Sequence, residues 1–341
     1  MAEVIDKYPV KTGEELDNSP IEWLIPSWIP RRGITLLCSD GGIGKSFLWI
    51  SIASALTKGN RTILDPGPII RSEKKILCFS GEDPECILRK RFEDSAAKLE
   101  NIFCVAQDSS APDFSFNSQF IINVISKIRP DFMIFDPLQA FIESNVDMSR
   151  RNQMRHAMKP LLSISSTFNL PIMVVVHTNK RQTAESGRDK MADSADLWDI
   201  ARSVIMLGFA DRNERYISLE KSSYSNHTAV DSVLFSLENG RVNYLDRVEK
   251  KMKDFIQDTK FIQQSERFPS KKQQCADQIL LILSENDGCI SGEILDQKLV
   301  DSGYSSKTIR NGKELLRDSN YLQFERLSNG KVVYRKSLMA P

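Results

Sequence analysis

The chain has 341 residues, enough for one large domain and a small one. Its 41% hydrophobic and 27% charged residues are typical of a globular protein. The net charge of +1 excludes a general electrostatic attraction to nucleic acid, so any such contact must come from local basic patches. The sequence shows neither a secretory signal pattern nor an apolar run long enough to span a membrane. We therefore expect a cytoplasmic protein without membrane contact.

Residues 1–30 begin polar and become apolar from Trp23, and we expect this segment to pack beside the loop that follows the first strand. From Ile34 to Leu207, apolar strand-like runs alternate with stretches of helical periodicity. Such alternation predicts an α/β fold with a mostly parallel sheet covered on both faces. The predicted strands are Ile34–Cys38, Lys75–Ser80, Ile102–Ala106, Phe132–Phe135, Ile172–Val176 and Ser203–Leu207, with hairpin-like additions at Arg215–Leu219 and Ser232–Leu237.

The 6 cysteines include no C-x-x-C pair, so we expect no zinc site. Cys38, Cys78 and Cys104 lie in the apolar runs, and we expect them to be buried, reduced thiols.

A glycine-rich segment separates the first strand from a helical pattern over Phe47–Leu56. Backbone N–H groups of such a turn, together with the N-terminus of the helix, cradle polyphosphates. Lys45 would reach the β- and γ-phosphates, and the Ser46 hydroxyl would bind Mg²⁺. Ser39 stands where the usual G-x-x-x-x-G-K-[ST] pattern has its first glycine. The segment predicts a nucleoside triphosphate site with ATP and Mg²⁺ as cofactors, bound by Asp40, Gly41, Gly42, Ile43, Gly44, Lys45 and Ser46.

Polar residues end three further predicted strands, at the edge where ligands bind in an open α/β sheet. Asp136 could hold Mg²⁺, although a strand-ending aspartate before a proline is also common. Glu82 could act as the general base on the attacking water, while Asp83 before Pro84 would cap the next helix. His177 could contact the γ-phosphate or the attacking water.

The segment after His177 is polar and basic, with Lys180, Arg181, Arg188 and Lys190. It is either a solvated surface or a loop that holds the phosphate backbone of single-stranded DNA, and the sequence leaves both open. Arg202 and Lys221 flank the later strands. Each is either ordinary surface charge or a cation that reaches the nucleotide of a neighbouring subunit.

The character of the sequence changes near Val248. Residues 249–274 are charged and glutamine-rich and predict a linker with some helix, after an ATPase domain of residues 1–248. Residues 275–341 predict three helices and a β-hairpin, the outline of a winged helix-turn-helix. From Ser305 onward the chain has eight basic and three acidic side chains, so we expect DNA binding, with a protein-contact role as the alternative. The expected DNA contacts are Lys307, Arg310 and Lys313 on the third helix and Lys331 in the hairpin.

The spaced motifs together resemble RepA-type hexameric helicases, a plasmid and phage branch of the RecA/DnaB-like ATPases. The resemblance covers about residues 20–225. It includes Glu22–Pro26, Asp40–Ser46, Gly81–Pro84, Asp136–Leu138, His177 with Lys180, and Ser194–Arg202. It implies a homo-hexameric ring with ATP between subunits and single-stranded DNA in the channel.

By position, the resemblance assigns the catalytic glutamate to Glu82, the γ-phosphate sensor to His177 and the arginine finger to Arg202, with Lys221 as a second trans-acting cation. The expected function is a DNA helicase in replication of a mobile element, in contact with replication proteins. The alternatives are a helicase loader or recombination mediator without unwinding, and an ATP-switched DNA-binding regulator.

Overall fold

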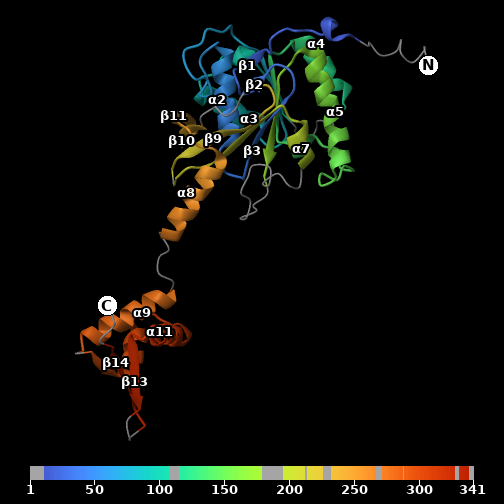
Figure 1. Ribbon diagram of the computed structural model, residues 1–341. Helices are drawn as coiled ribbons and strands as arrows, with labels where there is room; N and C mark the ends of the chain where they lie inside the picture. The colour runs from blue at the N-terminus through green and yellow to red at the C-terminus, as the bar shows by residue number, and fades with distance from the viewer. Residues whose placement is uncertain are drawn as a thin grey trace. The chain divides into compact units, whose positions relative to one another are not determined.

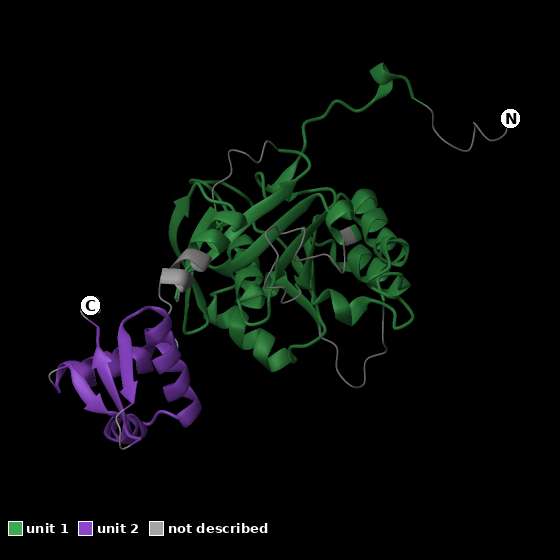
Figure 2. Ribbon diagram, turned by 60° about the horizontal axis from the view of Figure 1, so that its bottom comes forward, with its two compact units in different colours: residues 1–259 green, residues 260–341 purple. Residues whose placement is uncertain are grey.

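The structure, a computed structural model, describes residues 11–106, 115–178, 195–211, 213–225, 232–265, 271–286, 288–326 and 330–337. The chain divides into two compact units, residues 1–259 and 260–341 (Figure 2). Within the described residues, no helix is both long and apolar enough to span a membrane.

Unit 1 is built on a nine-stranded sheet in the order β11-β10-β9-β8-β3-β7-β6-β4-β5 (Figure 1). The strands from β8 to β5 are parallel, and β9, β10 and β11 continue the sheet in antiparallel fashion. The mostly parallel α/β sheet predicted from the sequence is therefore confirmed. The strands are β3 (Ile34–Ser39), β4 (Ile76–Ser80), β5 (Ile102–Ala106), β6 (Phe132–Asp136), β7 (Ile172–His177), β8 (Ser203–Phe209), β9 (Arg215–Ser222), β10 (Ser232–Glu238) and β11 (Arg241–Val248).

Helices cover both faces of this sheet (Figure 1). The apolar cluster on one face includes residues of α2 (Lys45–Thr57) and α3 (Glu85–Asp94). The cluster on the other face includes residues of α4 (Gln119–Ile128), α5 (Arg151–Phe168) and α7 (Ala195–Ile200). Because side chains alternate along a strand, Leu37 joins the first cluster and its neighbours Leu36 and Cys38 join the second. Short 3₁₀ turns lie at η1 (Gly13–Glu15), η2 (Leu99–Asn101) and η3 (Leu138–Phe141).

The segment before the first parallel strand lies elsewhere than expected. It forms a small hairpin of β1 (Trp23–Ile25) and β2 (Ile29–Pro30). Ser203 Oγ donates to the Trp28 carbonyl at 2.6 Å. Ser203 begins β8 and pairs with Thr35 near the start of β3, whereas the glycine-rich loop follows the end of β3. The hairpin therefore packs at the opposite edge of the sheet from the loop.

The expectation of buried, reduced thiols holds for Cys38 but is wrong for Cys78 and Cys104. Cys78 and Cys104 are paired in register on β4 and β5, with Cα atoms 4.8 Å apart, and they form a disulfide. Cys104 is also exposed, because β5 is an edge strand of the sheet.

Unit 2 has its own apolar core, which includes Ile279, Leu295 and Leu316. Its sheet has the order β12-β14-β13. The elements are α9 (Lys271–Ser284), β12 (Cys289–Ser291), α10 (Gly292–Asp301), α11 (Ser306–Asp318), β13 (Leu322–Arg326) and β14 (Val332–Lys336). A further helix, α8 (Met252–Ser265), spans the division between the units, and its Met252 and Phe255 are buried in the core of unit 1.

Candidate active site

The glycine-rich loop joins β3 to α2, as the sequence predicts. Gly42 has a φ of +79° and Gly44 a φ of +107°, values that side chains disfavour, so both positions require glycine. Ser39 is the last residue of β3 and pairs with His177 of β7. Because this is ordinary strand backbone, the departure from glycine at Ser39 does not disturb the loop.

Lys45 begins α2, and its ammonium group lies back over the loop. Its Nζ is 2.9 Å from the Ser39 carbonyl, 3.0 Å from the Asp40 carbonyl and 3.1 Å from Ser39 Oγ. It is also 3.1 Å from Nδ1 of His177. Burial lowers the pKa of Lys45, and the nearby carboxylates, Asp136 foremost, oppose that shift. The site thus holds a largely buried cation that a phosphate group would stabilise.

Ser46 and Asp136 meet as the sequence predicts for a magnesium site. Ser46 Oγ donates to Asp136 Oδ2 at 2.8 Å, and the indole Nε1 of Trp49 donates to the same oxygen at 2.6 Å. Burial raises the pKa of Asp136, and these two hydrogen bonds oppose that shift. Since the hydroxyl hydrogen points to Asp136, the lone pairs of Ser46 stay available, and hydroxyl and carboxylate oxygens are the ligands that Mg²⁺ prefers. The residues therefore fit a magnesium ion.

Glu82 follows β4 at the same edge and is exposed. The Gly81 N–H donates to the Asp136 carbonyl at 2.9 Å, which joins the ends of β4 and β6. The carboxylate of Glu82 is close enough to raise the pKa of Lys45 slightly. The expected capping role of Asp83 is wrong: the N-cap of α3 is Pro84, without a side-chain cap, and Asp83 instead forms an ion pair with Arg91.

The residues after β7 are described only in part. Thr178 donates through Oγ1 to Asp40 Oδ1 at 2.5 Å, which ties the end of β7 to the glycine-rich loop. The proposed DNA contacts of the following loop lie outside the described residues; they are Lys180, Arg181, Arg188 and Lys190.

Arg202 and Lys221 do not approach the loop of their own chain. Arg202 immediately precedes β8, and its N–H donates to the carbonyl of Ile34 at the start of β3. At about 3.3 Å per residue, the length of β3 separates this edge from the loop by about 17 Å. Lys221 pairs with Val204 on the neighbouring strand, and its Nζ donates to the Trp198 carbonyl at 2.7 Å.

The basic residues of α11 have different surroundings. Lys307 and Arg310 are exposed. Lys313 is buried, forms an ion pair with Asp296 and lies over the ring of Tyr334. It faces the interior of unit 2 and differs in this respect from the expected DNA contact. Lys331 precedes β14, with Nζ 3.6 Å from Glu293.

Sequence reasoning missed the residues that brace the glycine-rich loop. Leu237 of β10 lies against Gly44, and the ring of Phe47 lies against Gly240 in the turn between β10 and β11. The guanidinium of Arg91 stands 4.8 Å from the centre of the Phe47 ring. These contacts join segments far apart in the sequence. Only Trp49 had a local signal, because it lies three residues after Ser46 and therefore on the same helix face.

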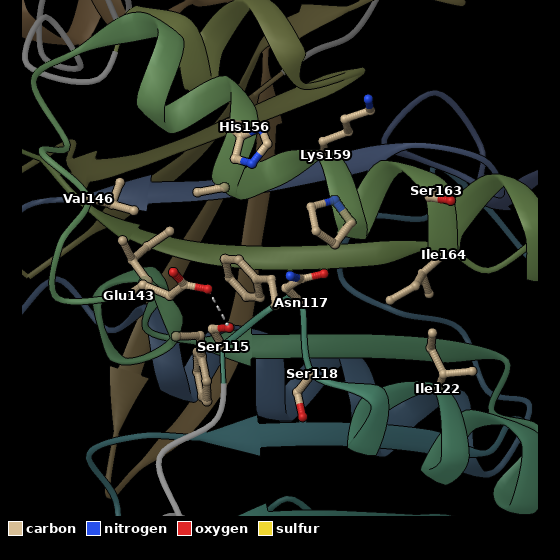
Figure 3. A pocket seen from close by; sticks show the side chains of 15 residues that line it. Ser115, Asn117, Ser118, Ile122, Glu143, Val146, His156, Lys159, Ser163 and Ile164 are labelled. Atoms are coloured by element: carbon tan, nitrogen blue, oxygen red, sulfur yellow. Dashed lines mark hydrogen bonds between the residues drawn. The ribbon is translucent and has the colours of Figure 1, made fainter.

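A separate cavity of about 540 Å³ lies on the face of the sheet that α4 and α5 cover (Figure 3). Asn117 and Ser118 line it from the segment before α4, and His156 and Ser163 line it from α5. Its apolar walls include Phe141, which belongs to the cluster under these helices. Since α2 and the glycine-rich loop lie on the other face, this cavity is not the phosphate site.

A glycine-rich loop at the carboxyl edge of a parallel sheet, with a lysine, a serine and an aspartate converging on it, defines a P-loop ATPase with a RecA-like core. The chain belongs to the AAA domain family, whose model matches residues 10–183. The solved structure of a helicase ATPase domain is similar in fold, with a TM-score of 0.52 and 13% identity. That match covers 72% of this chain and 97% of the chain of the helicase domain.

Curated relatives include DNA repair protein RadA from several bacteria. RadA of Listeria monocytogenes is 26% identical over 149 residues, which is 43% of this chain and 28% of RadA. RadA of Streptococcus pyogenes is 23% identical over 176 residues, 51% of this chain and 34% of RadA. The chain thus spans about a third of the length of these relatives.

Proposed function

We propose that this ATPase acts on DNA, as a helicase or translocase that moves along single strands during replication of a plasmid, phage or other mobile element. The observation that carries the proposal is the convergence of Lys45, Ser46, Asp136 and His177 at one edge of the sheet. This edge suits ATP hydrolysis. The helicase assignment rests on the spaced sequence motifs that resemble hexameric helicases.

Each side chain has a distinct role in this proposal. Lys45 neutralises charge on the β- and γ-phosphates, and Ser46 with Asp136 holds Mg²⁺, which screens the same charge. Glu82 accepts a proton from the attacking water, and its exposure leaves room for that water. His177 leaves Lys45 for the γ-phosphate.

The proposal includes a homo-hexameric ring. Arg202 and Lys221 lie at the edge of the sheet away from their own nucleotide loop. A cation there can stabilise the transition state only on the nucleotide of another copy. Single-stranded DNA would then lie in the channel, against the loop that carries Lys180, Arg181, Arg188 and Lys190.

We further propose that unit 2 is a winged helix that anchors the protein on duplex DNA. Lys307 and Arg310 lie exposed on α11, the third helix of the unit, and Lys331 lies beside the turn between β13 and β14. Lys313 is left out of this surface because it is buried against Asp296.

The similarity to RadA favours a second candidate, an ATPase of DNA repair or recombination that works without unwinding, or a helicase loader. A strand-displacement assay with a forked substrate and ATP separates these functions, with Lys45→Ala as the inactive control. Displacement supports the helicase. DNA-stimulated hydrolysis without displacement supports the second candidate. Assembly on ATP with neither activity supports an ATP-switched regulator.

A further inference from the structure

Trp49 contacts the proposed metal site, although its side chain belongs to the core. It lies on α2, one helical turn after Ser46, and its ring is 1% exposed. The indole Nε1 donates to Asp136 Oδ2 at 2.6 Å. Its ring meets the Phe92 ring of α3 edge to face, with centroids 5.8 Å apart. Trp49 therefore joins the packing of α2 and α3 directly to the carboxylate at the end of β6.

The hydrogen bond has a physical reason. A buried indole N–H needs an acceptor, and a buried carboxylate needs donors. Asp136 is only 8% exposed, and Ser46 and Trp49 both donate to its Oδ2. The Ser46 hydroxyl would change its surroundings when a cation binds it. The indole is held by the core and cannot, so it is the donor that stays in place.

Apolar packing alone does not explain a tryptophan at this position. Leu48, Ile50 and Ile52 fill neighbouring buried positions of α2 with aliphatic side chains. An aliphatic or phenylalanine side chain at position 49 would also bury apolar surface, but it could not donate to Asp136.

We propose that Trp49 is a positioning residue, which fixes the Asp136 carboxylate through its indole N–H so that the carboxylate can hold the Mg²⁺ of a magnesium–nucleotide complex. This inference rests on the proposed function of the site as an ATPase centre. It concerns the metal step alone and is independent of any activity on DNA.

The test measures how much Mg²⁺ the full-length protein needs to bind a fluorescent ATP analogue, for wild type and Trp49→Phe. Loss of a hydrogen bond to a metal-holding residue costs about 10- to 100-fold in metal affinity. We expect the Mg²⁺ concentration at half-saturation to rise by such a factor. Steady-state hydrolysis should show the same rise and recover most of its maximal rate at high Mg²⁺. An unchanged Mg²⁺ requirement in Trp49→Phe would overturn the inference.

Two controls separate the hydrogen bond from packing. Trp28→Phe shortens another buried tryptophan of the same apolar cluster, away from the loop, and should leave the Mg²⁺ requirement unchanged. Replacement of Trp49 by benzothienylalanine keeps the ring shape and puts sulfur in place of the N–H. It should reproduce the shift of Trp49→Phe, and it decides the question if Trp49→Phe fails to fold. A shift in Trp28→Phe, or none with benzothienylalanine, overturns the inference.

The wild-type measurement distinguishes this inference from the proposed function. If wild type shows no Mg²⁺-dependent nucleotide binding, the ATPase centre itself fails, and the inference with it. If wild type requires Mg²⁺ and the variants require the same concentration, only the role of Trp49 is overturned.

Discussion

At the scale of single residues, the site divides binding from turnover between Lys45 and Glu82. The Lys45 ammonium is buried among neutral oxygens and the His177 ring, while the Glu82 carboxylate is exposed at the mouth of the site. The lysine therefore meets the phosphates directly, and the glutamate is placed to meet only the water.

We predict that Lys45→Ala weakens ATP binding and abolishes hydrolysis, because the phosphate charge loses its counter-charge. Glu82→Gln should bind ATP about as tightly as wild type and lose about 100-fold or more of its rate, because only the proton acceptor is removed. Nucleotide titrations beside steady-state rates measure both quantities. An equal loss of binding in the two variants would contradict this division of roles.

Asp136 gives a prediction about pH. Its pKa is raised by burial in the fold, so ionising it costs stability as the pH rises above the ordinary aspartate value of 3.8. Asp136→Asn cannot ionise. We predict that the variant gains stability relative to wild type as the pH rises from about 4 to 7. Unfolding in denaturant at several pH values, without nucleotide or Mg²⁺, measures the difference.

Asp147→Asn provides a control of opposite sign for this experiment. The carboxylate of Asp147 is exposed, and hydrogen bonds from Ser149 lower its pKa. This variant should therefore lose a little stability relative to wild type over the same pH range. A gain for Asp136→Asn that does not change with pH would show that burial of the charge is not its cause.

At the scale of helices and strands, the central elements could be predicted because each parallel strand is a continuous apolar run. The predicted Ile34–Cys38 and Ile102–Ala106 differ from β3 and β5 by no more than one residue. No such run marks β11, an edge strand with mostly exposed residues such as Asn243 and Asp246. An edge strand buries little, so its pattern stays polar.

The candidate site was predictable to the extent that its residues end strands or follow the glycine-rich pattern. Lys45, Ser46 and Asp136 meet as expected for this reason. The disulfide partner of Cys78 and the acceptor for Trp49 depend on which strands are neighbours in space. Strand order arises from packing of the whole sheet, and the local pattern does not contain it.

The helix α11 carries the element-scale prediction. Lys307 and Arg310 are exposed, whereas Lys313 pairs with Asp296 under the ring of Tyr334. We predict that the double variant Lys307→Ala with Arg310→Ala weakens duplex binding and lowers the slope of log affinity against log salt by about 2, because two phosphate contacts are lost. Binding of duplex by the full-length protein, without ATP and across a salt series, measures this slope.

Lys313→Ala is the matched control on the same helix. It should leave the salt slope unchanged and destabilise unit 2 by about 1–2 kcal/mol, because the packed stem and the ion pair are both lost. A slope that falls in Lys313→Ala, or that stays constant in the double variant, would contradict the proposed DNA surface on α11.

At the scale of the whole molecule, the fold places the proposed catalytic groups at two opposite edges of one sheet. The glycine-rich loop, Asp136 and His177 lie at the carboxyl ends of the parallel strands. Arg202 lies at the start of β8, beside Gly33 and Ile34. Because β3 is rigid and fully buried, no small movement within one chain can bring the guanidinium of Arg202 to its own nucleotide. If this arginine acts in hydrolysis, two copies of the chain must share each site.

This arrangement makes assembly part of the chemistry. We predict that Arg202→Ala binds ATP and forms the same oligomer as wild type, but hydrolyses about 1000-fold more slowly, the usual cost of losing an arginine finger. Glu82→Gln should be inactive for a different reason. In mixed oligomers, an interface between one copy of each variant can combine an intact Glu82 with an intact Arg202, so the mixture should hydrolyse ATP faster than either variant alone. Steady-state rates across mixing ratios measure the recovery, with exchange of subunits verified by native mass spectrometry. Verified mixed oligomers without recovery at any ratio would place Arg202 outside the hydrolysis step, and the ring would then need another source for its trans-acting charge.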